Sequence, residues 1–262
     1  MNGVRSVRLL SVGKLAFLFL LLITGTLQAQ WVQMNGPYGA NVNALFRHGS
    51  KIFAATDGGL FLADTAEGEW KACPNVLFHA TSIAGNDSVL GVIGLGRFYQ
   101  SADGGTSWQM DSMFSWYVRG LAAERNLFLV FAHDTLFLSA DNSFSWKKIN
   151  PPAPQISMLM IRNGELFVWA NGLYRSTDSG ASWNLMLNDS ISVHAYGLVA
   201  NDRSIFVLSD LNVLRSDDDG IHWITLPSIN SRWITSLKTD KDTLIADTPR
   251  YGIYSSTDNG NT

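Results

Sequence analysis

From residue 30 onward the chain alternates short apolar runs with clusters of turn-forming residues. The runs are four to six residues long and rich in β-branched and aromatic residues, which is typical of β-strands. One stretch, for example, predicts strands at 195–200, 205–209, 213–216 and 223–226, with a turn at 201–204. No helical pattern competes in this region. We therefore expect an all-β fold made of repeated units of four short strands.

A short motif, Ser-x-Asp-x-Gly-x-x-Trp, recurs once in each unit. Tryptophans at positions 31, 70, 108, 146, 183 and 223 are separated by 39, 38, 38, 37 and 40 residues. The copy ending at Trp70 is degenerate, the copy ending at Trp146 has Ser143 in place of glycine, and the last copy stops at residue 262, one position before its expected tryptophan. The motif positions are Ser101, Asp103, Gly105, Trp108, Ser139, Asp141, Trp146, Ser176, Asp178, Gly180, Trp183, Ser216, Asp218, Gly220, Trp223, Ser256, Asp258 and Gly260. This period indicates six tandem units.

The motif fits a turn between the third and fourth strands of each unit. Its Ser and Asp side chains accept hydrogen bonds from nearby backbone N–H groups, and its glycine adopts the positive φ that the turn needs. Its tryptophan buries about 150–250 Å² of surface, which we expect to lie between neighbouring sheets. The motif is therefore predicted to stabilise the fold.

Four-stranded sheets repeated around an axis form a β-propeller, for which about four to eight blades are typical. Six four-stranded blades are predicted here, and an open solenoid is the alternative. Residues 31–34 have the pattern of a fourth strand, whereas the last unit has only three, so the N-terminal strand is expected to complete the last blade and close the ring. Closure would cover two exposed sheet edges. A truncated reading frame explains the same pattern, and the sequence does not distinguish the two.

Residues 1–29 have the pattern of a secretory signal peptide. Three basic residues and no acidic ones precede the apolar run Leu15–Ile23, and small and polar residues follow it up to Ala29. We predict cleavage after Ala29, which leaves 30–262 as the propeller. An uncleaved membrane anchor is the alternative, but the apolar run is shorter than the about 20 residues of a spanning helix. The mature protein is expected to be secreted or at the cell surface, without stable membrane insertion.

The composition fits an exported protein with a large core. Hydrophobic residues make up 46% of the 262 residues and charged residues 16%. The net charge of −3 becomes −6 without residues 1–29, because the 19 basic residues fall to 16 against 22 acidic ones. This acidic balance disfavours nucleic acid and anionic membranes as partners.

The lone Cys73 cannot form an internal disulfide, so packing must stabilise the fold. We expect the protein to be a monomer.

The motif resembles the Asp-box, or bacterial neuraminidase repeat, of sialidases, sortilin-type propellers, xyloglucanases and photosystem II stability/assembly factor-like proteins. The resemblance covers nearly all of residues 31–262. The opening of the first unit, Asn43-Ala44-Leu45-Phe46 followed by Lys51 to Phe61, is similar to secreted repeat proteins of Bacteroidota-type bacteria. The resemblance implies a β-propeller, but a shared fold does not settle the function.

Two rival functions follow from this resemblance. A sialidase-like glycoside hydrolase needs an arginine triad, a Tyr-Glu nucleophile pair and an acidic Asp. The sequence does not show these parts. The spacing of the candidate arginines does not indicate a triad either; they are Arg97, Arg119 and Arg250. A photosystem II assembly factor-like chaperone module would be expected to carry a basic surface patch, which the acidic net charge disfavours.

The acidic and histidine residues show no catalytic or metal-binding pattern. General acid catalysis needs a partly desolvated carboxyl, but the glutamates fall in predicted turns on the motif face: Glu67, Glu69, Glu124 and Glu165. The carboxylates predicted on the opposite face, where a glycosidase pair would lie, are Asp57, Asp134 and Asp247. The five histidines are scattered without ligand spacing. We predict no metal, no cofactor and no catalytic residue.

The favoured function is a non-enzymatic binding or scaffold module. Propeller ligands usually meet the face formed by the loops between blades and the turns between second and third strands, which we call the mouth. Aromatic and charged residues gather in these segments and suit glycan or peptide recognition. The candidate ligand-binding residues are Tyr38, Asp57, His79, Arg97, Trp116, Tyr117, His133, His194, Trp233, Arg250 and Tyr251. Phe78 and Phe114 lie in the same segments, and packing of such rings at the hub is the alternative. We predict that the mouth binds an extracellular glycan or protein without chemical turnover.

Overall fold

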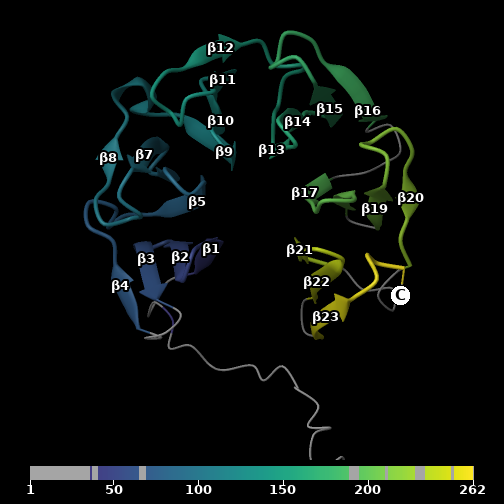
Figure 1. Cartoon of the computed structure of the whole chain (residues 1–262), viewed down its shortest axis with the longest axis horizontal. Coiled ribbons are helices and arrows are strands. Elements are labelled where there is room, and N and C mark those ends of the chain that lie inside the picture. Colours follow the sequence, from purple (N-terminus) through teal and green to yellow (C-terminus); the bar gives the residue numbers. More distant parts are fainter. Residues whose placement is uncertain are drawn as a thin grey trace, which may run out of the picture. The chain divides into compact units, whose positions relative to one another are not determined.

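Each repeat forms one antiparallel sheet, or blade, in the computed structural model of the chain (Figure 1). The structure describes residues 36, 41–64, 69–188, 195–209, 212–227, 234–248 and 251–261. Within these residues, blades 1 to 5 have four strands and blade 6 has three. The chain divides into the units Met1–Met34 and Asn35–Thr262, and all six blades belong to the second. The predicted signal peptide and the predicted strand at 31–34 lie outside the described residues.

The strands of each blade follow one another in sequence order. Blade 1 comprises β1 (Val42–His48), β2 (Lys51–Thr56), β3 (Gly59–Asp64) and β4 (Trp70–Ala72). Blade 2 comprises β5 (Ala80–Gly85), β6 (Leu90–Gly94), β7 (Arg97–Ser101) and β8 (Gln109–Met110). Blade 3 comprises β9 (Val118–Glu124), β10 (Leu127–Ala132), β11 (Thr135–Ser139) and β12 (Lys147–Ile149). Blade 4 comprises β13 (Met158–Arg162), β14 (Glu165–Trp169), β15 (Gly172–Ser176) and β16 (Asn184–Asn188). Blade 5 comprises β17 (Ala195–Ala200), β18 (Ile205–Ser209), β19 (Val213–Ser216) and β20 (Ile224–Thr225), and blade 6 comprises β21 (Ser236–Asp240), β22 (Thr243–Thr248) and β23 (Gly252–Ser256).

The blades are arranged radially, with the first strand of each one innermost (Figure 1). Along the series β1, β5, β9, β13, β17 and β21, each strand packs beside the next. The second strands of blades 2 to 5 are covered on both faces by neighbouring blades, and β6 and β18 are accordingly buried along their whole length. This explains why their sequences are continuous apolar runs and not alternating ones. The architecture confirms the predicted six-bladed β-propeller.

The motif turns share one hydrogen-bond network, which the copy around Asp178 illustrates. Ser176 Oγ donates to Asp178 Oδ1 (2.8 Å) and accepts from Gly180 N (2.8 Å). Asp178 also accepts from Ser182, from the backbone N at Oδ1 (2.9 Å) and from the side-chain Oγ at Oδ2 (2.6 Å). The hydrogen bonds from Ser182 lower the pKa of Asp178 to about 2. The carboxylate is therefore ionised and engaged within the turn.

The motif tryptophans of blades 2 to 5 lie between consecutive blades. Trp146 of blade 3 packs edge to face on Phe98 of blade 2, with ring centroids 5.7 Å apart and an interplanar angle of 89°. Trp183 and Trp223 each donate from Nε1 to a backbone carbonyl of the preceding blade, at 3.0 and 3.3 Å. Edge-to-face pairing adds to the stabilisation from burial. The expected position between sheets is confirmed for Trp108, Trp146, Trp183 and Trp223, and Trp31 lies outside the described residues.

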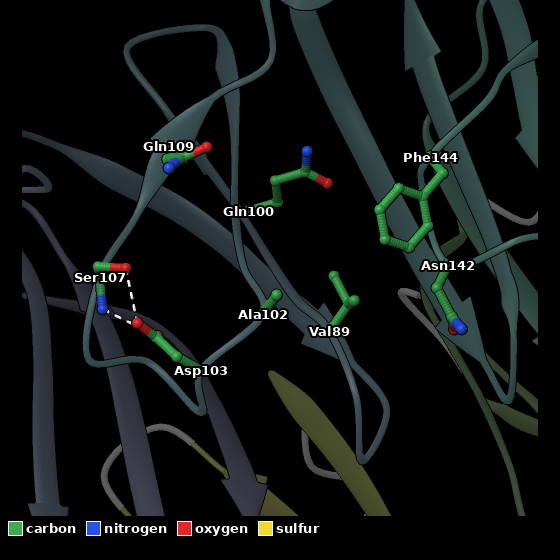
Figure 2. Close-up of a pocket in the computed structure, with 8 residues that line it drawn as sticks. All are labelled: Val89, Gln100, Ala102, Asp103, Ser107, Gln109, Asn142 and Phe144. Atoms are coloured by element: carbon green, nitrogen blue, oxygen red, sulfur yellow. Dashed lines mark hydrogen bonds between the residues drawn. The ribbon is translucent and has the colours of Figure 1, made fainter.

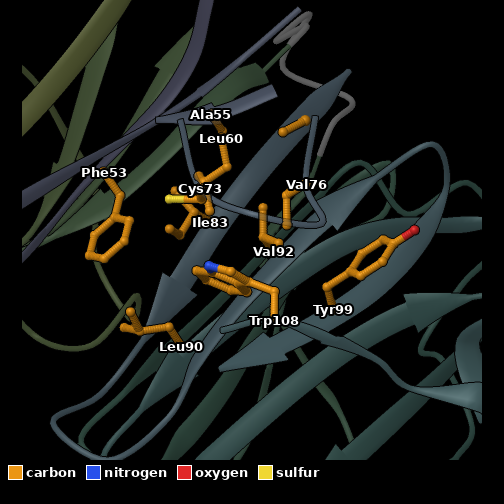
Figure 3. Packing of buried hydrophobic residues seen from close by; sticks show 11 residues of the cluster. Phe53, Ala55, Leu60, Cys73, Val76, Ile83, Leu90, Val92, Tyr99 and Trp108 are labelled. Atoms are coloured by element: carbon orange, nitrogen blue, oxygen red, sulfur yellow. The ribbon is translucent and has the colours of Figure 1, made fainter. Parts of the chain in front are cut away.

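A cluster of buried residues fills the space between blades 1 and 2 (Figure 3). Phe53 and Leu60 of blade 1 face Val92 and Trp108 of blade 2, and all four are nearly inaccessible to solvent. Such burial stabilises by about 25 cal/mol for each Å² of apolar surface removed from water. Cys73 lies in the same cluster, and burial raises the pKa of its thiol to about 11.

Polar side chains join consecutive blades on the face that carries the motif turns. Arg162, which is buried, donates from Nε to the carbonyl oxygen of Asn201 at 3.0 Å and pairs with Asp219. Glu124 accepts from the backbone N of Gly164 at 2.8 Å. Both contacts connect the end of the first strand of one blade with the next blade. Glu124 therefore lies on the motif face, as its sequence position predicts.

One short helical element was not predicted from the sequence. Residues Ser112–Phe114 form a 3₁₀ turn, η1, between blades 2 and 3. Asp111 caps it by accepting from Met113 N at 2.9 Å. The predicted strands of the fifth unit agree with β17, β18 and β19, whereas its fourth strand, expected at 223–226, is confined to β20.

Candidate functional site at the mouth

Backbone hydrogen bonds join the two kinds of segment that form the mouth, which are the loops between blades and the turns between second and third strands. Leu95 N, in the turn after β6, donates to the carbonyl oxygen of His79 at 3.1 Å, and Val118 N donates to that of Gly96 at 2.9 Å. The second bond links blade 3 to the turn of blade 2. Leu95 and Tyr117 nevertheless keep more than half of their surface exposed. The mouth therefore presents large side chains on a fixed backbone.

Three aromatic rings form a cluster on the mouth of blade 3. Trp116 is 4.8 Å from His133 and 5.1 Å from Tyr117 between ring centroids, with interplanar angles of 81° and 69°. Tyr117 and His133 lie 5.9 Å apart. Both adopt left-handed backbone conformations, with φ of 60° and 51°, which are uncommon outside glycine. Trp116 remains 57% exposed and Tyr117 54%.

The segment before this cluster is anchored in the core. Phe114, at the end of η1, is fully buried and packs edge to face on Trp146 with ring centroids 4.9 Å apart. It also contacts Phe137 at 5.1 Å. Phe114 therefore belongs to the core and does not face the mouth, whereas Trp116, two residues later, reaches the surface. For Phe114 the structure therefore shows the packing alternative, because the capped 3₁₀ turn directs its ring inward.

A charged pair borders the aromatic cluster. The Arg119 guanidinium lies over the Tyr117 ring, 5.7 Å from its centroid, and Arg119 Nη1 is 4.0 Å from Asp134 Oδ1. Both charged side chains are largely exposed, so the pair contributes little to stability. Instead, Arg119 can leave Asp134 to contact an acidic ligand group, and Asp134 can leave Arg119 to contact a basic one.

Arg119 and Asp134 also line a depression of about 630 Å³ on the mouth. Its other walls are Phe131 and the segment 151–156, which contains Pro151, Pro152 and Pro154. Prolines have fixed φ angles and lose little entropy on binding. Arg119 also borders a second cavity of about 330 Å³ among the inner strands β5, β9, β13, β17 and β21. The mouth depression and the central cavity thus share Arg119 as a lining residue.

A separate polar cluster lies on the mouth between blades 1 and 2. Asp57 accepts from the side-chain amides of Asn41 (2.8 Å) and Asn43 (3.0 Å) and lies 3.3 Å from His79 Nε2. The hydrogen bond from Asn43, followed by that from Asn41, lowers the pKa of Asp57. Asp57 and His79 are each about half exposed. The structure therefore brings these two predicted residues together.

The predicted mouth residues fall into four groups. Trp116, Tyr117 and His133 form the aromatic cluster, and Asp57 and His79 form the polar one. Arg97 and Tyr251 are exposed and belong to neither cluster. The remaining candidates lie outside the described residues: Tyr38, His194, Trp233 and Arg250. Sequence reasoning did not assign the proline segment or Asn41 and Asn43 to the mouth, although the Pro-Pro-Ala-Pro stretch is visible in the sequence.

The described carboxylates are dispersed among different partners. Asp134 pairs with Arg119, whereas Asp247 accepts from Thr235 Oγ1 at 2.8 Å. Glu165 forms a two-fold hydrogen-bonded pair with Arg175 at 2.7 and 2.8 Å. In the described part of the chain, no three His, Cys, Asp or Glu residues are grouped closely enough to hold a metal ion. No helix there has both the length and the apolarity to cross a membrane.

Comparison with known proteins identifies the fold. No family model matches the chain, and no curated protein matches it in sequence. Among solved structures, the extracellular domain of the putative hybrid two component system BT4673 from B. thetaiotaomicron is 15% identical, with a TM-score of 0.67 over 84% of this chain and 32% of that one. YCF48 bound to D1 peptide is 16% identical (TM-score 0.55, 69% of this chain and 66% of that one). The GH74 xyloglucanase from Xanthomonas campestris is 16% identical (TM-score 0.69, 88% and 46%).

These similarities define the class of protein. The chain is a β-propeller, and it spans about a third of the length of the first of these structures. An extracellular domain, a peptide-bound protein and a xyloglucanase share this fold at low identity. The likeness therefore gives the fold, and the function must be argued from the side chains.

Proposed function

We propose that this protein is an extracellular, non-enzymatic binding module that holds an extended protein segment across the mouth of blades 3 and 4. The observation that carries the proposal is the exposed cluster of Trp116, Tyr117 and Arg119 beside a depression of about 630 Å³. Trp, Tyr and Arg are the residues most enriched among those that dominate binding energy at protein interfaces.

The arrangement of these side chains favours a protein segment over a glycan. The rings of the cluster meet at steep angles and form no extended flat platform. The depression combines one basic and one acidic side chain with rigid proline walls, which suits the mixed polarity of a polypeptide. A glycan remains the second candidate, because the half-exposed indole of Trp116 offers one ring face to a sugar.

Four further observations support an exported binding module. The first 29 residues have a signal-peptide pattern. The motif turns resemble those of Asp-box propellers, and one solved structure of similar fold is an extracellular domain. Another, YCF48, is bound to a D1 peptide. The sialidase-like and assembly-factor-like alternatives have less support, since the described carboxylates have separate partners and the net charge is acidic.

The test is selection of peptides from a displayed random library against the wild-type protein, followed by affinity measurement with variants. Trp116→Ala and Arg119→Ala should each weaken a selected peptide by roughly thirtyfold, as expected for a residue worth about 2 kcal/mol. Leu185→Ala is the matched control, because Leu185 is exposed to a similar extent on the outer strand β16. Equal binding by all variants would remove the mouth of blade 3 as the site. Trp116-dependent signals on a glycan array, without any peptide, would assign the mouth to a glycan.

A further inference from the structure

A second pocket lies on the opposite face, between the motif turns of blades 2 and 3. It has a volume of about 260 Å³, and Gln100, Gln109, Asn142 and Phe144 are among its lining residues. Gln100 and Gln109 are opposite each other on β7 and β8. Figure 2 shows Gln100 between Gln109 on one side and the Phe144 ring on the other. The pocket is independent of the mouth site.

The same position in blade 4 is occupied by an ion pair. Gln100 and Arg175 each directly precede the motif serine, and both reach toward the motif turn of the next blade. Arg175 fills this space with its guanidinium, which binds Glu165 at 2.7 and 2.8 Å and Asp219 O at 3.3 Å. In blade 2 the residue corresponding to Glu165 is Val89, which lines the pocket. The pocket exists because Val89 and Gln100 replace a longer, charged pair.

The motif turn of blade 3 also departs from the repeat at this place. Ser143 stands where the other complete copies have glycine, and its Oγ donates to Gln100 Oε1. This bond orients the Gln100 amide and leaves its Nε2 without an acceptor in the described part of the structure. The next residue, Phe144, is 83% exposed. Two departures from the repeat thus meet at one pocket, one orienting an amide and the other exposing an aromatic ring.

The remaining polar groups are similarly placed for an external partner. Asn142 accepts at Oδ1 from Asn86 Nδ2 (2.9 Å), and among the described residues its own Nδ2 has no acceptor. The Gln109 side chain has no hydrogen-bond partner there either. Asp103 is already engaged, because its carboxylate accepts from the backbone N of Thr106 (3.0 Å) and from Ser107 Oγ (2.6 Å). The pocket therefore offers mainly amide donors and acceptors.

These groups match the surface of a sugar. Hydroxyl groups both donate and accept, as side-chain amides do, and the C–H face of a pyranose meets the electron-rich face of an aromatic ring. Asp103 is the only charged residue in the lining, so an anionic sugar would be repelled. The volume of about 260 Å³ is just below the about 300–1,000 Å³ typical of small-molecule sites. It fits a single ring.

We propose that Gln100, Gln109, Asn142 and Phe144 form a binding site for one neutral pyranose unit, as a terminal or branch residue of a glycan, on the motif face between blades 2 and 3. Phe144 contacts the apolar face of the sugar, and the amides bind its hydroxyl groups. This site adds a second ligand to the protein and does not depend on the mouth.

The test is saturation-transfer difference NMR on the full chain with the neutral disaccharides maltose, cellobiose and lactose as probes. The wild-type protein should transfer saturation to at least one of them. Phe144→Ala should weaken binding about tenfold, and Phe144→Tyr should retain it, because the ring face is preserved. Gln100→Arg combined with Val89→Glu reproduces the blade 4 pair and should abolish the signal by filling the pocket.

Two controls separate this site from the other surfaces. Ile221→Ala changes the exposed residue at the same turn position in blade 5 and should leave binding unchanged, as should Trp116→Ala at the mouth. The proposal is overturned if none of the disaccharides shows transfer, or if Phe144→Ala binds like the wild type. If Trp116→Ala loses sugar binding while Phe144→Ala keeps it, the sugar binds at the mouth, and this result would also overturn the proposal. Circular dichroism shows whether each variant is folded. If the double variant does not fold, Phe144→Ala still decides the test, because it changes only an exposed side chain.

Discussion

The indole of Trp108 in blade 2 stands almost perpendicular to the ring of Phe53 in blade 1, with centroids 6.3 Å apart and an interplanar angle of 79°. Both rings are buried, and Trp108 Nε1 donates to the carbonyl oxygen of Gly105 at 3.2 Å. Gly105 itself lies against the same phenyl ring. One motif turn, its tryptophan and the neighbouring sheet therefore pack as a unit, and the repeat of this unit holds consecutive blades together.

Removal of the indole should be costly at this position. Trp108→Ala leaves a cavity between two sheets and is expected to lower the free energy of unfolding by about 3–5 kcal/mol. Trp183→Ala is the matched control, because Trp183 has the same motif position but is only partly buried, and its cost should be clearly smaller. Urea denaturation followed by fluorescence or circular dichroism gives both values. Similar losses in the two variants would contradict the role assigned to burial between blades.

The glycine of the motif turn is required by space as well as by conformation. Gly105 has a φ of 87°, and a Cβ there would lie 2.4 Å from Phe53 ring atoms. Gly164 has a φ of 80°, but a Cβ added to it would meet no atom within 4 Å. Gly105→Ala should therefore destabilise the protein by more than Gly164→Ala, which measures the conformational cost alone. Thermal unfolding of both variants tests this, and equal shifts in Tm would show that the contact with Phe53 is relieved without cost.

The propeller could be predicted from the sequence because its signals are local and repeated. Strand boundaries at 195–200 and 205–209 agree with β17 and β18, since apolar runs and turn clusters bound them directly. The position of Trp108, Trp146, Trp183 and Trp223 between sheets followed from the constant place of the tryptophan in the turn.

The candidate site was predictable only in part, because its geometry depends on distant contacts. Phe114 and Trp116 are two residues apart and are both large aromatic residues, yet one is buried and the other is exposed. The difference arises from the 3₁₀ turn capped by Asp111, which leaves no signal in the repeat pattern. The pairing of Arg119 with Asp134 and the depression beside the prolines likewise require the folded blades.

The motif aspartates should make stability depend on pH in the acid range. Hydrogen bonds in the turn lower the pKa of Asp178 to about 2, whereas an aspartate in the unfolded chain titrates near about 3.9. Above about pH 5 both states are ionised and the contribution is complete. As the pH falls from about 4 toward 2, the unfolded chain takes up the proton first, so stability is lost. The same direction holds for Asp103, Asp141 and Asp218.

Asp178→Asn isolates this effect. The variant should be less stable than the wild type at neutral pH, and the difference between them should shrink as the pH is lowered from about 4 to 2. Asp87→Asn is the control, since Asp87 is exposed and makes no hydrogen bond in the described part of the structure. Tm measured at a series of pH values gives the comparison. A constant difference between Asp178→Asn and the wild type over this range would show that the turn does not perturb the carboxylate.

Cys73 should report on the integrity of the contact between blades 1 and 2. Its side chain is buried beside Trp108, and burial raises the pKa of the thiol to about 11. Because the thiolate is the reactive form, a thiol reagent at about pH 8 should label the native protein slowly and the urea-unfolded protein at once. Trp108→Ala should accelerate labelling without global unfolding if the two blades separate locally, whereas Trp183→Ala, in another blade, should not. Rapid labelling of the native wild-type protein would mean that this part of the core opens freely, and the packing of Trp108 on Phe53 could then not be what holds the first two blades together.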